Sequence, residues 1–593
     1  MKKRIIVFLI CFASNISFAY TQSNAINLSL DQTEALPKEN IFVHFNSSLF
    51  LAGESIYYKI YCLNEGANTL SALSKIAYLE LVGENQNIVF KHKIALETGV
   101  GYGDFIIPVT VNSGNYKLIA YTQWMKNEGV EVFFSSDISI INPFQSSQET
   151  ILIDKDADQP NNTNTLLSLN SDTNTLKSIN SNLLDIKINK KTFQKRDKVM
   201  LTLKSKNDES LSGNYSISVK KIDALHGLTS KAPSSNAYVN HLVNRKQSFK
   251  KINHLPELRG ELISGTLLRV SDDKPVANEQ VVLSIPQIDF ILRVSKTNQD
   301  GVFYFNINED YDKQIAVLQV LGKDAKDFKI VLDEHIPMDY NNLDFEEFKI
   351  SSDYKEDLEQ RNIYNQIENG YFSLKPNRLK EIDTVQPFFG DYFSTFYLDD
   401  YTRFNKIQET FVEIVKDAFI KKDNSQKFNF YVNSLNPYEQ LEKPAGVIVD
   451  GILLQDFDEL LSYDSRRINR ISIARTETNF ILGTKTFGGF IVIETIDGKF
   501  FDELTKGNLT NVTLFKPQPK KAYYKKVYTS DDKLNRTPDY RQQLFWEPNI
   551  NIIDQEIDFT FFTSDNTGNY EISIEGFTKN GTPVSIRDYI IVN

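Results

Sequence analysis

Short runs in which apolar and polar residues alternate recur along most of this chain, with turn residues between them. In the stretches 41–45 and 56–60 the apolar side chains fall at every second position, and the turn Ala52-Gly53-Glu54 separates the two. A period of two places successive side chains on opposite faces of a β-strand. Short strands at this spacing are typical of β-sandwiches, so the chain is predicted to be mainly β.

Cysteine content determines how such sandwiches can be stabilised. The chain has two cysteines, Cys11 and Cys62, and the first lies in a segment that we expect to be removed. A lone Cys62 cannot form an intrachain disulfide, so stability must come from apolar cores. A chain of 593 residues has room for several such cores, and about four domains are expected.

Composition and period divide the chain into segments. Residues 145–183 are rich in Asn, Ser and Thr and lack aromatic residues, which is typical of a linker. Helical spacing appears at 354–371 and again at 404–419, where the apolar residues of the second helix would share a face. Those residues are Ile407, Phe411, Ile414, Val415 and Phe419. We expect β-sandwiches over residues 39–143, 184–224, 257–333 and 536–593, and a mixed α and β domain over 392–497.

The first residues have the layout of a secretory signal peptide. Three cations, Lys2, Lys3 and Arg4, precede the apolar run 5–13, and Ser17 and Ala19 suit a cleavage site. We therefore expect residues 1–19 to be a signal peptide and the protein to be exported. No later segment has the length of a membrane helix, so the mature chain is expected to have no transmembrane segment of its own. With a net charge of −11 and no basic cluster, nucleic-acid binding is not expected.

Several stretches resemble known families of β domains. Residues 39–143, in which the Gly53-Glu54 turn leads into a strand, look like the second macroglobulin domain of alpha-macroglobulin-type proteins. The segments 184–224 and 536–593 are read as further sandwiches of this macroglobulin-like type. Residues 257–333, with the turn Asp300-Gly301, resemble the carboxypeptidase regulatory-like domain, a small transthyretin-like sandwich without catalytic groups.

Residues 392–497 resemble the plug domain of TonB-dependent outer-membrane receptors. The stretches that carry the likeness are 447–451, which ends in Asp-Gly, 467–473, and the Gly-rich return 482–493. The combination is similar to Bacteroidetes-type envelope proteins. It implies Ig/macroglobulin-like and transthyretin-like sandwiches plus one α+β plug-like domain, in the periplasm or at the cell surface, associated with the outer membrane. The stretch after Asp497 is too short for the strands of a large outer-membrane barrel, so no barrel is expected here.

Motifs that would indicate chemistry are missing or incomplete. The six histidines have no metal-ligand spacing, and the acidic run Asp154, Asp156 and Asp158 lacks the later Gly and Glu of a calcium loop. Cys62 is followed by Leu63-Asn64 rather than by a thioester motif. No Gly-x-Ser-x-Gly elbow is present, although a triad built from distant residues stays open. We therefore predict no cofactor, no metal site and no catalytic residues.

Two features of the plug-like domain are candidates for partner binding. Asp450 and Gly451 lie at a strand end, where the alternative interpretation is an ordinary turn. Phe388, Phe389 and Tyr392 belong to an aromatic cluster that would anchor a protein partner if exposed, the alternative being burial in a core. The leading hypothesis is a non-catalytic accessory or scaffold protein that binds an envelope protein, such as an outer-membrane barrel. The alternatives are a glycan- or peptide-binding surface module and a hydrolase with a dispersed site.

Overall fold

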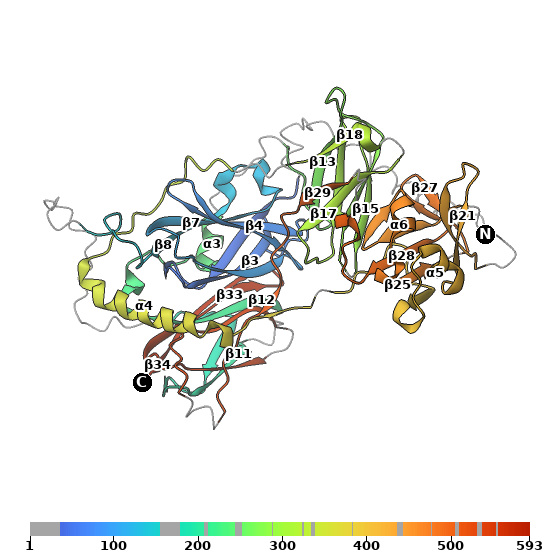
Figure 1. The fold of residues 1–593 in the computed structure, drawn as a ribbon. Coiled ribbons are helices and arrows are strands. Elements are labelled where there is room, and N and C mark those ends of the chain that lie inside the picture. Colours follow the sequence, from blue (N-terminus) through green and yellow to red (C-terminus); the bar gives the residue numbers. More distant parts are fainter. Residues whose placement is uncertain are drawn as a thin grey trace, which may run out of the picture. The chain divides into compact units, whose positions relative to one another are not determined.

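A computed structural model describes most of the chain. The predicted fold class is confirmed, because the described residues form a mainly β, multidomain protein with many small sheets and few helices (Figure 1). The described residues are 36–153, 178–206, 212–242, 252–287, 289–322, 325–333, 338–381, 383–435, 443–475, 477–503, 509–529, 536–552 and 556–593. The predicted signal peptide, the run Asp154–Asp158 and most of the predicted linker lie outside them.

The chain divides into two compact units, and each is assembled from segments that are separated in sequence. The first, which we call the sandwich unit, comprises Ile26–Leu258, Pro337–Lys380 and Pro517–Asn593. The second, the mixed unit, comprises Arg259–Ile336 and Glu381–Lys516 among the described parts of the chain.

The first sandwich of the sandwich unit lies within the predicted segment 39–143. One sheet has the order β1-β3-β6, and the other has the order β2-β8-β7-β4-β5. The bounds are β1 Glu39–Phe45, β2 Leu49–Leu51, β3 Ser55–Asn64, β4 Ile76–Gly83, β5 Ile88–Ala95, β6 Val100–Ile106, β7 Gly114–Tyr121 and β8 Phe134–Ile141.

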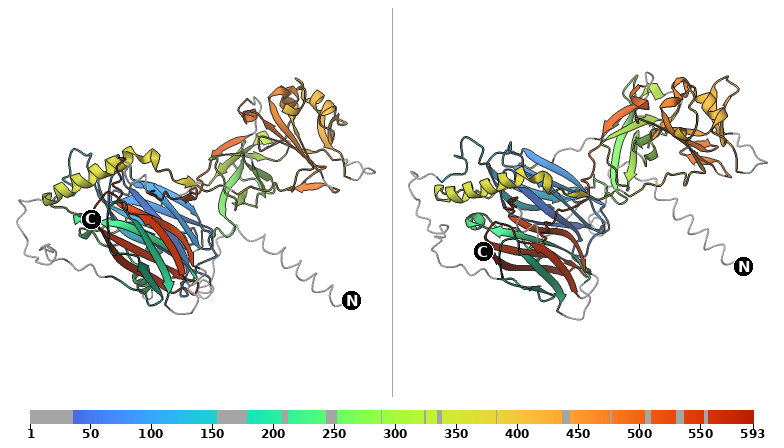
Figure 2. Two further views of the ribbon diagram at one scale, coloured as in Figure 1. Left: turned by 90° about the horizontal axis from the view of Figure 1, so that it is seen from below. Right: turned by 60° about the horizontal axis from the view of Figure 1, so that its bottom comes forward.

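The second sandwich combines strands from two segments of the sandwich unit that lie far apart in the sequence. Its sheets have the orders β10-β34-β33-β12-β31 and β32-β11-β9. Figure 2 shows the green strands of the earlier segment side by side with the red strands of the C-terminal segment. The bounds are β9 Leu184–Ile188, β10 Thr192–Phe193, β11 Lys198–Ser205, β12 Gly213–Ile222, β31 Gln543–Ile552, β32 Glu556–Phe562, β33 Gly568–Thr578 and β34 Pro583–Val592.

The prediction of separate sandwiches over 184–224 and 536–593 is therefore wrong. Strand β12 lies between β31 and β33, and one apolar core contains residues of both segments, such as Ile217 and Ile574. Neither half has enough strands to cover its apolar face alone, so the two halves complete each other. The period of two identifies strands but not their partners.

Strand β1 is buried along its whole length because its sheet packs on the other sheet of the first sandwich with one face and on the second sandwich with the other. On one side, the ring of Phe42 lies 5.8 Å from the ring of Phe577 in β33. His44 likewise contacts Ser216 of β12. The alternating residues Ile41, Val43 and Phe45 are also buried. Polar His44 is tolerated in this buried strand because its ring is hydrogen-bonded to Ser216.

Two helices and a short ribbon complete the sandwich unit. Helix α4 agrees with the helical spacing at 354–371, and Leu358 in it packs on a core that includes Phe348 and Ile350. Ile151, inside the predicted linker, is also buried in that core. The bounds are α3 Ser235–Leu242, α4 Lys355–Gly370, β19 Arg378–Leu379 and β30 Lys521–Ala522.

The mixed unit contains a small sandwich built mostly from residues 257–333. Its sheets have the orders β16-β13-β18 and β15-β14-β17-β29, so a strand from after the plug-like region extends the second sheet. The bounds are β13 Glu261–Arg269, β14 Gln280–Ile285, β15 Ile291–Lys296, β16 Val302–Ile307, β17 Ile315–Val320, β18 Phe328–Leu332 and β29 Thr510–Thr513.

The same unit contains a five-stranded sheet with the order β20-β25-β28-β23-β24. Its central strands β23 and β28 are parallel, and they are buried on both faces. Val447 and Ile491 belong to the core on one face, whereas Ile448 and Val492 belong to the core on the other. The bounds are β20 Ser394–Tyr397, α5 Ile407–Glu413, β21 Ala418–Lys422, β22 Phe428–Val432, β23 Gly446–Val449, β24 Ile452–Leu454, α6 Asp458–Ser462, β25 Ile468–Ala474, β26 Phe480–Leu482, β27 Lys485–Phe487 and β28 Phe490–Thr495.

The predicted helix over 404–419 is too long. Helix α5 ends at Glu413, and Phe419 lies in strand β21, where it pairs with Tyr431 and is 39% exposed. The two rings stack with their centres 5.3 Å apart. The helical spacing extends past the end of α5 because Phe419, a residue of the β21–β22 hairpin, falls at the same interval as the apolar residues of the helix.

Candidate functional site: polar cavities of the sandwich unit

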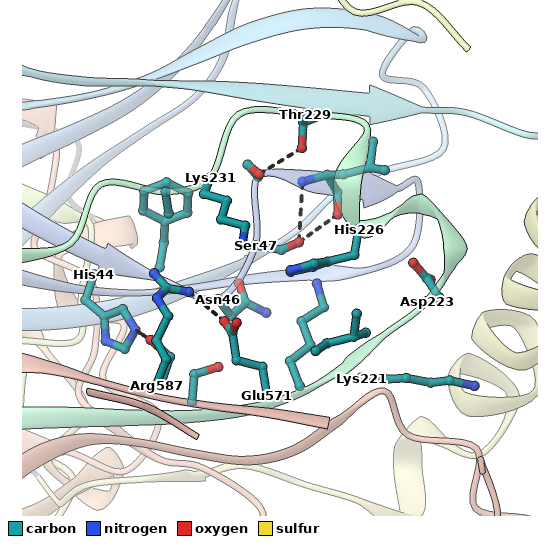
Figure 3. Close-up of a pocket in the computed structure, with 18 of the residues that line it drawn as sticks. His44, Asn46, Ser47, Lys221, Asp223, His226, Thr229, Lys231, Glu571 and Arg587 are labelled. Carbon is teal, nitrogen blue, oxygen red and sulfur yellow. Dashed lines mark hydrogen bonds and ion pairs between the residues drawn. The ribbon is translucent and has the colours of Figure 1, made fainter. Parts of the chain in front are cut away.

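The two sandwiches of the sandwich unit enclose a polar cavity, which we call the inter-sandwich cavity (Figure 3). It has a volume of about 70 Å³. Its walls come from the turn after β1, the end of β12, the loop after β12, helix α4 and strands β33 and β34. Lys231 and Arg587 lie in the same lining as Asp223 and Glu571, so the cavity is strongly charged but mixed in sign.

A serine and a histidine meet beside this cavity, where β1 lies against β12. His44 Nδ1 lies 2.7 Å from Ser216 Oγ, and the Tyr61 hydroxyl lies 2.9 Å from the same oxygen. Burial, followed by the charge of Arg587, lowers the pKa of His44 to about 3, so the imidazole is neutral at physiological pH. The other ring nitrogen, Nε2, lies 3.5 Å from Ser573 Oγ.

This pair lacks two properties of a catalytic triad. A triad needs a carboxylate behind the histidine and a nucleophile that substrate can reach. The second nitrogen of His44 has a hydroxyl beside it instead, and Ser216 has 0% of its surface exposed. The cluster therefore holds β1 against β12 of the facing sheet through buried, satisfied polar groups.

Glu575 is a buried carboxyl group in the wall of the cavity. Its Oε2 accepts hydrogen bonds of 2.8 Å from both the backbone N–H and the hydroxyl of Ser235, and its Oε1 accepts one of 2.8 Å from Ser585. Burial raises the pKa of Glu575 to about 7, although these hydrogen bonds and Arg587 oppose the rise. Glu575 therefore changes its charge near neutral pH.

Arg361 of α4 joins three parts of the sandwich unit. Its Nε and Nη2 donate to the two carboxylate oxygens of Glu54 at 2.8 and 2.7 Å, and its Nη1 donates to Asp223 at 3.1 Å. Nη2 also donates to the backbone oxygen of Leu49 at 3.1 Å. Burial would raise the pKa of Glu54, but Arg361 outweighs it and lowers that pKa. The acid of the Ala52-Gly53-Glu54 turn is thus the anchor for α4.

Lys220 lies near the end of β12 and lines both this cavity and a second one. Its ammonium group lies 4.7 Å from the centre of the Phe50 ring. The carboxylates of Glu54 and Asp223 attract it, but both of them form their ion pairs with Arg361. Burial lowers the pKa of Lys220 to about 8. A cation in this setting can still bind an anion at neutral pH.

The second cavity, which we call the aromatic groove, has a volume of about 180 Å³. It is lined by aromatic residues and by amide side chains from several segments of the sandwich unit. The aromatic residues are Tyr57, Phe372, Tyr523, Tyr524, Tyr540, Phe545 and Trp546. Such a mixture of flat apolar faces and a few polar groups is typical of small-ligand sites.

Asp450 and Gly451 form the turn between β23 and β24 in the mixed unit. Their φ angles are 44° and 83°, and Asp450 accepts hydrogen bonds from the Thr495 N–H at 2.8 Å and the Thr495 hydroxyl at 2.7 Å. A Cβ on Gly451 would lie 2.8 Å from Phe290 Cβ. These contacts favour the turn interpretation, and the role of both residues in partner binding stays a prediction.

The aromatic cluster of the mixed unit is partly core and partly surface. Phe389 is 8% exposed, and its ring stacks on that of Phe490 with the ring centres 5.2 Å apart. The centre of the Tyr392 ring lies 5.6 Å from that of Phe389. Phe388 also contacts Phe490, yet it is 40% exposed. Burial is therefore the better account of Phe389, while Phe388 remains available to a partner.

The polar residues of the sandwich unit were not predicted as site residues. His44, Ser216, Arg361 and Glu575 come from four separate segments, and no local motif connects them. No signal in the sequence marked Glu575, because Glu571, Ser573 and Glu575 follow one another at a period of two, which is typical of a solvent-facing side of a strand.

In the part of the chain that the structure describes, no cluster of three or more His, Cys, Asp or Glu side chains suits a metal ion. Among the helices described, none has the length and apolarity needed to cross a membrane. Cys62, also described, is buried and forms no disulfide.

Comparison with known proteins finds distant structural likeness. No family model and no curated protein matches this chain. The alpha-2-macroglobulin of Salmonella reacted with methylamine is 9% identical with a TM-score of 0.23, over 96% of this chain and 40% of that one. The Escherichia coli alpha-2-macroglobulin activated by porcine elastase is 8% identical with a TM-score of 0.23, over 94% and 44%. The Escherichia coli adhesin FdeC is 10% identical with a TM-score of 0.14, over 50% and 65%.

The chain thus spans less than half the length of these macroglobulins. TM-scores this low do not establish a common fold for the whole chain, and they carry no information about its activity or partners. What the fold and cavities do define is a class: a mainly β, multidomain protein with polar and aromatic cavities in its sandwich unit.

Proposed function

We propose that this chain is a non-catalytic protein of the bacterial cell envelope, at the outer membrane or in the periplasm. It acts as an accessory or scaffold subunit by binding another envelope protein, such as an outer-membrane barrel. The export pattern at the N-terminus supports the location, and the plug-like residues 392–497 support the kind of partner. The observation that carries the proposal is a sheet edge flanked by exposed aromatic residues.

That edge is strand β20 of the mixed unit. It pairs with β25 and is the outermost strand of its sheet. Phe393, directly before the strand, is 53% exposed, and Tyr397, its last residue, is 49% exposed. Phe388 nearby is 40% exposed. An edge strand offers backbone N–H and C=O groups to a partner strand, and exposed aromatic residues are common anchors in protein interfaces.

The geometry of the polar cluster supports a non-catalytic role. His44 is neutral and has no carboxylate behind it, and Ser216 is sealed from solvent. Asp450, the acidic candidate residue of the plug-like stretch, uses its carboxylate to accept two hydrogen bonds from Thr495 at the end of β28. The hypothesis of a dispersed hydrolytic site gains no support from these residues.

A photocrosslinking amino acid placed at Phe393 tests the proposal in the native envelope. Mass spectrometry should identify an outer-membrane protein attached to this position. The matched control is the same amino acid at Ile315, which is 58% exposed on β17 of the same unit. The proposal fails if no envelope protein is attached at Phe393, or if both positions attach the same set of proteins.

A second candidate function is the binding of a glycan or peptide. The aromatic groove of the sandwich unit favours it, because its lining combines aromatic rings with amides. This candidate uses a different unit from β20, so the two functions can hold together.

A further inference from the structure

We propose that the aromatic groove binds an oligosaccharide that carries a carboxylate, and that Lys220 contacts this carboxylate. The inference names a ligand class and a site in the sandwich unit. It is independent of the envelope partner proposed for β20, because it rests on residues of the other unit.

The first argument is the aromatic wall. The rings of Tyr57 and Trp546 stack at 5.9 Å with an angle of 29° between their planes, and Tyr523 meets Tyr57 edge-on at 5.2 Å. Phe372 stands in the lining with 49% of its surface exposed. The face of an aromatic ring carries partial negative charge. The C–H face of a sugar ring, which is slightly positive, packs well against such a surface.

The second argument is the set of amides in the same lining. An amide side chain both donates and accepts hydrogen bonds, as sugar hydroxyls do. Asn365 Nδ2 donates to the Ala52 backbone oxygen at 2.9 Å, and Asn369 Nδ2 donates to Gly53 and to Asn365 Oδ1 at 3.2 Å. These bonds hold the side chains in place. The amide residues in the lining of the groove are Asn46, Asn365, Asn369, Asn377, Gln542 and Gln543.

Two buried polar atoms in this lining lack a partner. In the described chain, nothing accepts a hydrogen bond from Trp546 Nε1, and nothing donates one to Gln542 Oε1. Trp546 is 4% exposed, so water does not readily compensate its indole N–H. Buried donors and acceptors are nearly always satisfied in native proteins. A hydroxyl-rich ligand in the groove, with a small rearrangement of the side chains, would satisfy both.

The third argument is charge. The other charged side chains in the lining have partners of opposite sign: Glu54 pairs with Arg361, Glu368 with Lys375, and Arg541 with Asp539. Lys220 forms no ion pair of its own among the described residues, because the carboxylates that attract it, Glu54 and Asp223, are both bonded to Arg361. A carboxylate on the ligand would give Lys220 a direct partner, and a charge-assisted hydrogen bond in a partly dry site is strong.

The volume limits the size of the bound group. The groove holds about 180 Å³. Drug-sized ligands usually occupy roughly 300–1,000 Å³. The groove therefore suits one sugar ring, with the neighbouring sugars of the oligosaccharide lying over the exposed rim near Phe372.

Titration calorimetry on the full chain tests the role of Lys220. The probes are tetramers of galacturonic acid and of mannuronic acid, and the methyl esters of both. At least one acid should bind, about tenfold more tightly than its ester. Lys220→Met should remove that preference, and Lys220→Arg, which keeps the charge, should retain most of it.

A further variant, at the half-exposed Phe372, tests the aromatic wall. Phe372→Ala should weaken binding of the acid about tenfold, because it removes a stacking surface at the rim. Phe144→Ala is the matched control, because Phe144 is 51% exposed in the same unit and does not line the groove. It should leave the affinity unchanged.

Three outcomes would overturn the inference. One is that neither acidic tetramer binds the wild-type chain. Another is that Lys220→Met and wild type discriminate equally between acid and ester. The third is that an acidic peptide such as tetraglutamate binds and both acidic sugars do not, which would assign the groove to peptides.

Discussion

Arg361 is a cation that is only 6% exposed, and its partners come from three places in the chain. Its guanidinium bonds both oxygens of Glu54 and also reaches Asp223, which a lysine cannot do with one ammonium group. Two carboxylates would lose the cation that is bonded to them if it were removed. Removing one partner of a buried ion pair lowers the stability of a protein more than most single substitutions do, because the other charge stays buried.

Arg361→Ala should therefore lower the free energy of unfolding of the sandwich unit by about 3–5 kcal/mol. The control is Lys355→Ala on the same helix, whose pair with Glu359 is exposed on both sides. That change should cost less than about 0.5 kcal/mol. Urea denaturation measures both, and equal losses for the two variants would contradict the anchoring role of Arg361.

The raised pKa of Glu575 predicts that the stability of the protein depends on pH. Its pKa is about 7 in the folded protein and returns to the ordinary 4.5 when the chain unfolds. Between these values the folded state holds a proton that the unfolded state has lost. The stability that comes from protonated Glu575 is fully present below pH 4.5. The free energy of unfolding then falls by about 3 kcal/mol as the pH rises to 7.

Glu575→Gln should flatten this decline, because glutamine does not titrate and can still accept the hydrogen bond from Ser235 N–H. Urea denaturation of wild type and variant at about pH 5, 6, 7 and 8 measures the difference in slope. An unchanged slope in the variant would show that another group controls the dependence.

At the scale of elements, β12 is the strand on which the second sandwich depends. It pairs with β31 on one side and with β33 on the other, and its buried residues Tyr215, Ile217 and Val219 belong to the shared core. A chain that ends at residue 536 would lack four of the strands in that sandwich. The remaining strands could not bury their apolar side chains.

We expect residues 178–222 to be unprotected from hydrogen exchange in a chain truncated at 536, because local stability follows buried contacts. Adding residues 536–593 as a separate polypeptide should restore protection. The first sandwich, whose strands all lie before residue 142, serves as the internal control. Protection of 178–222 without the C-terminal segment would mean that this half folds alone.

The same element shows what sequence could and could not predict. The period of two located β12 and β33 correctly, because side-chain alternation is a local property. Their pairing was missed, since the apolar residues of β12 would suit many partner strands. The polar site was missed for a related reason: His44, Arg361 and Glu575 are close in space but far apart in sequence. Phe419 was misplaced because its spacing fits a helix and a hairpin equally well.

At the scale of the whole molecule, each unit has its own apolar cores. Ile491 belongs to a core of the mixed unit, and Ile572 belongs to the core of the second sandwich. Both are 0% exposed. Units with separate cores should unfold in separate transitions, and a single free energy of unfolding does not describe such a chain.

Scanning calorimetry should therefore resolve two transitions. Ile491→Ala and Ile572→Ala should each lower the midpoint of one transition only, since an isoleucine truncated in a core costs about 2–5 kcal/mol. The two variants are controls for each other. A common shift of both transitions by either variant would mean that the units unfold as one.

The pairing of β12 with β31 also bears on how the protein is made. Gln543 in β31 donates a hydrogen bond to Ser218 in β12, and the two residues are 325 positions apart in the sequence. A ribosome releases the N-terminal part first. The strands within 178–222 must therefore wait, with an apolar face uncovered, until residues 543–592 have been synthesised. A nascent chain of this design would need protection from aggregation with other chains, and the synthesis of β31 to β34 would decide when that protection can end.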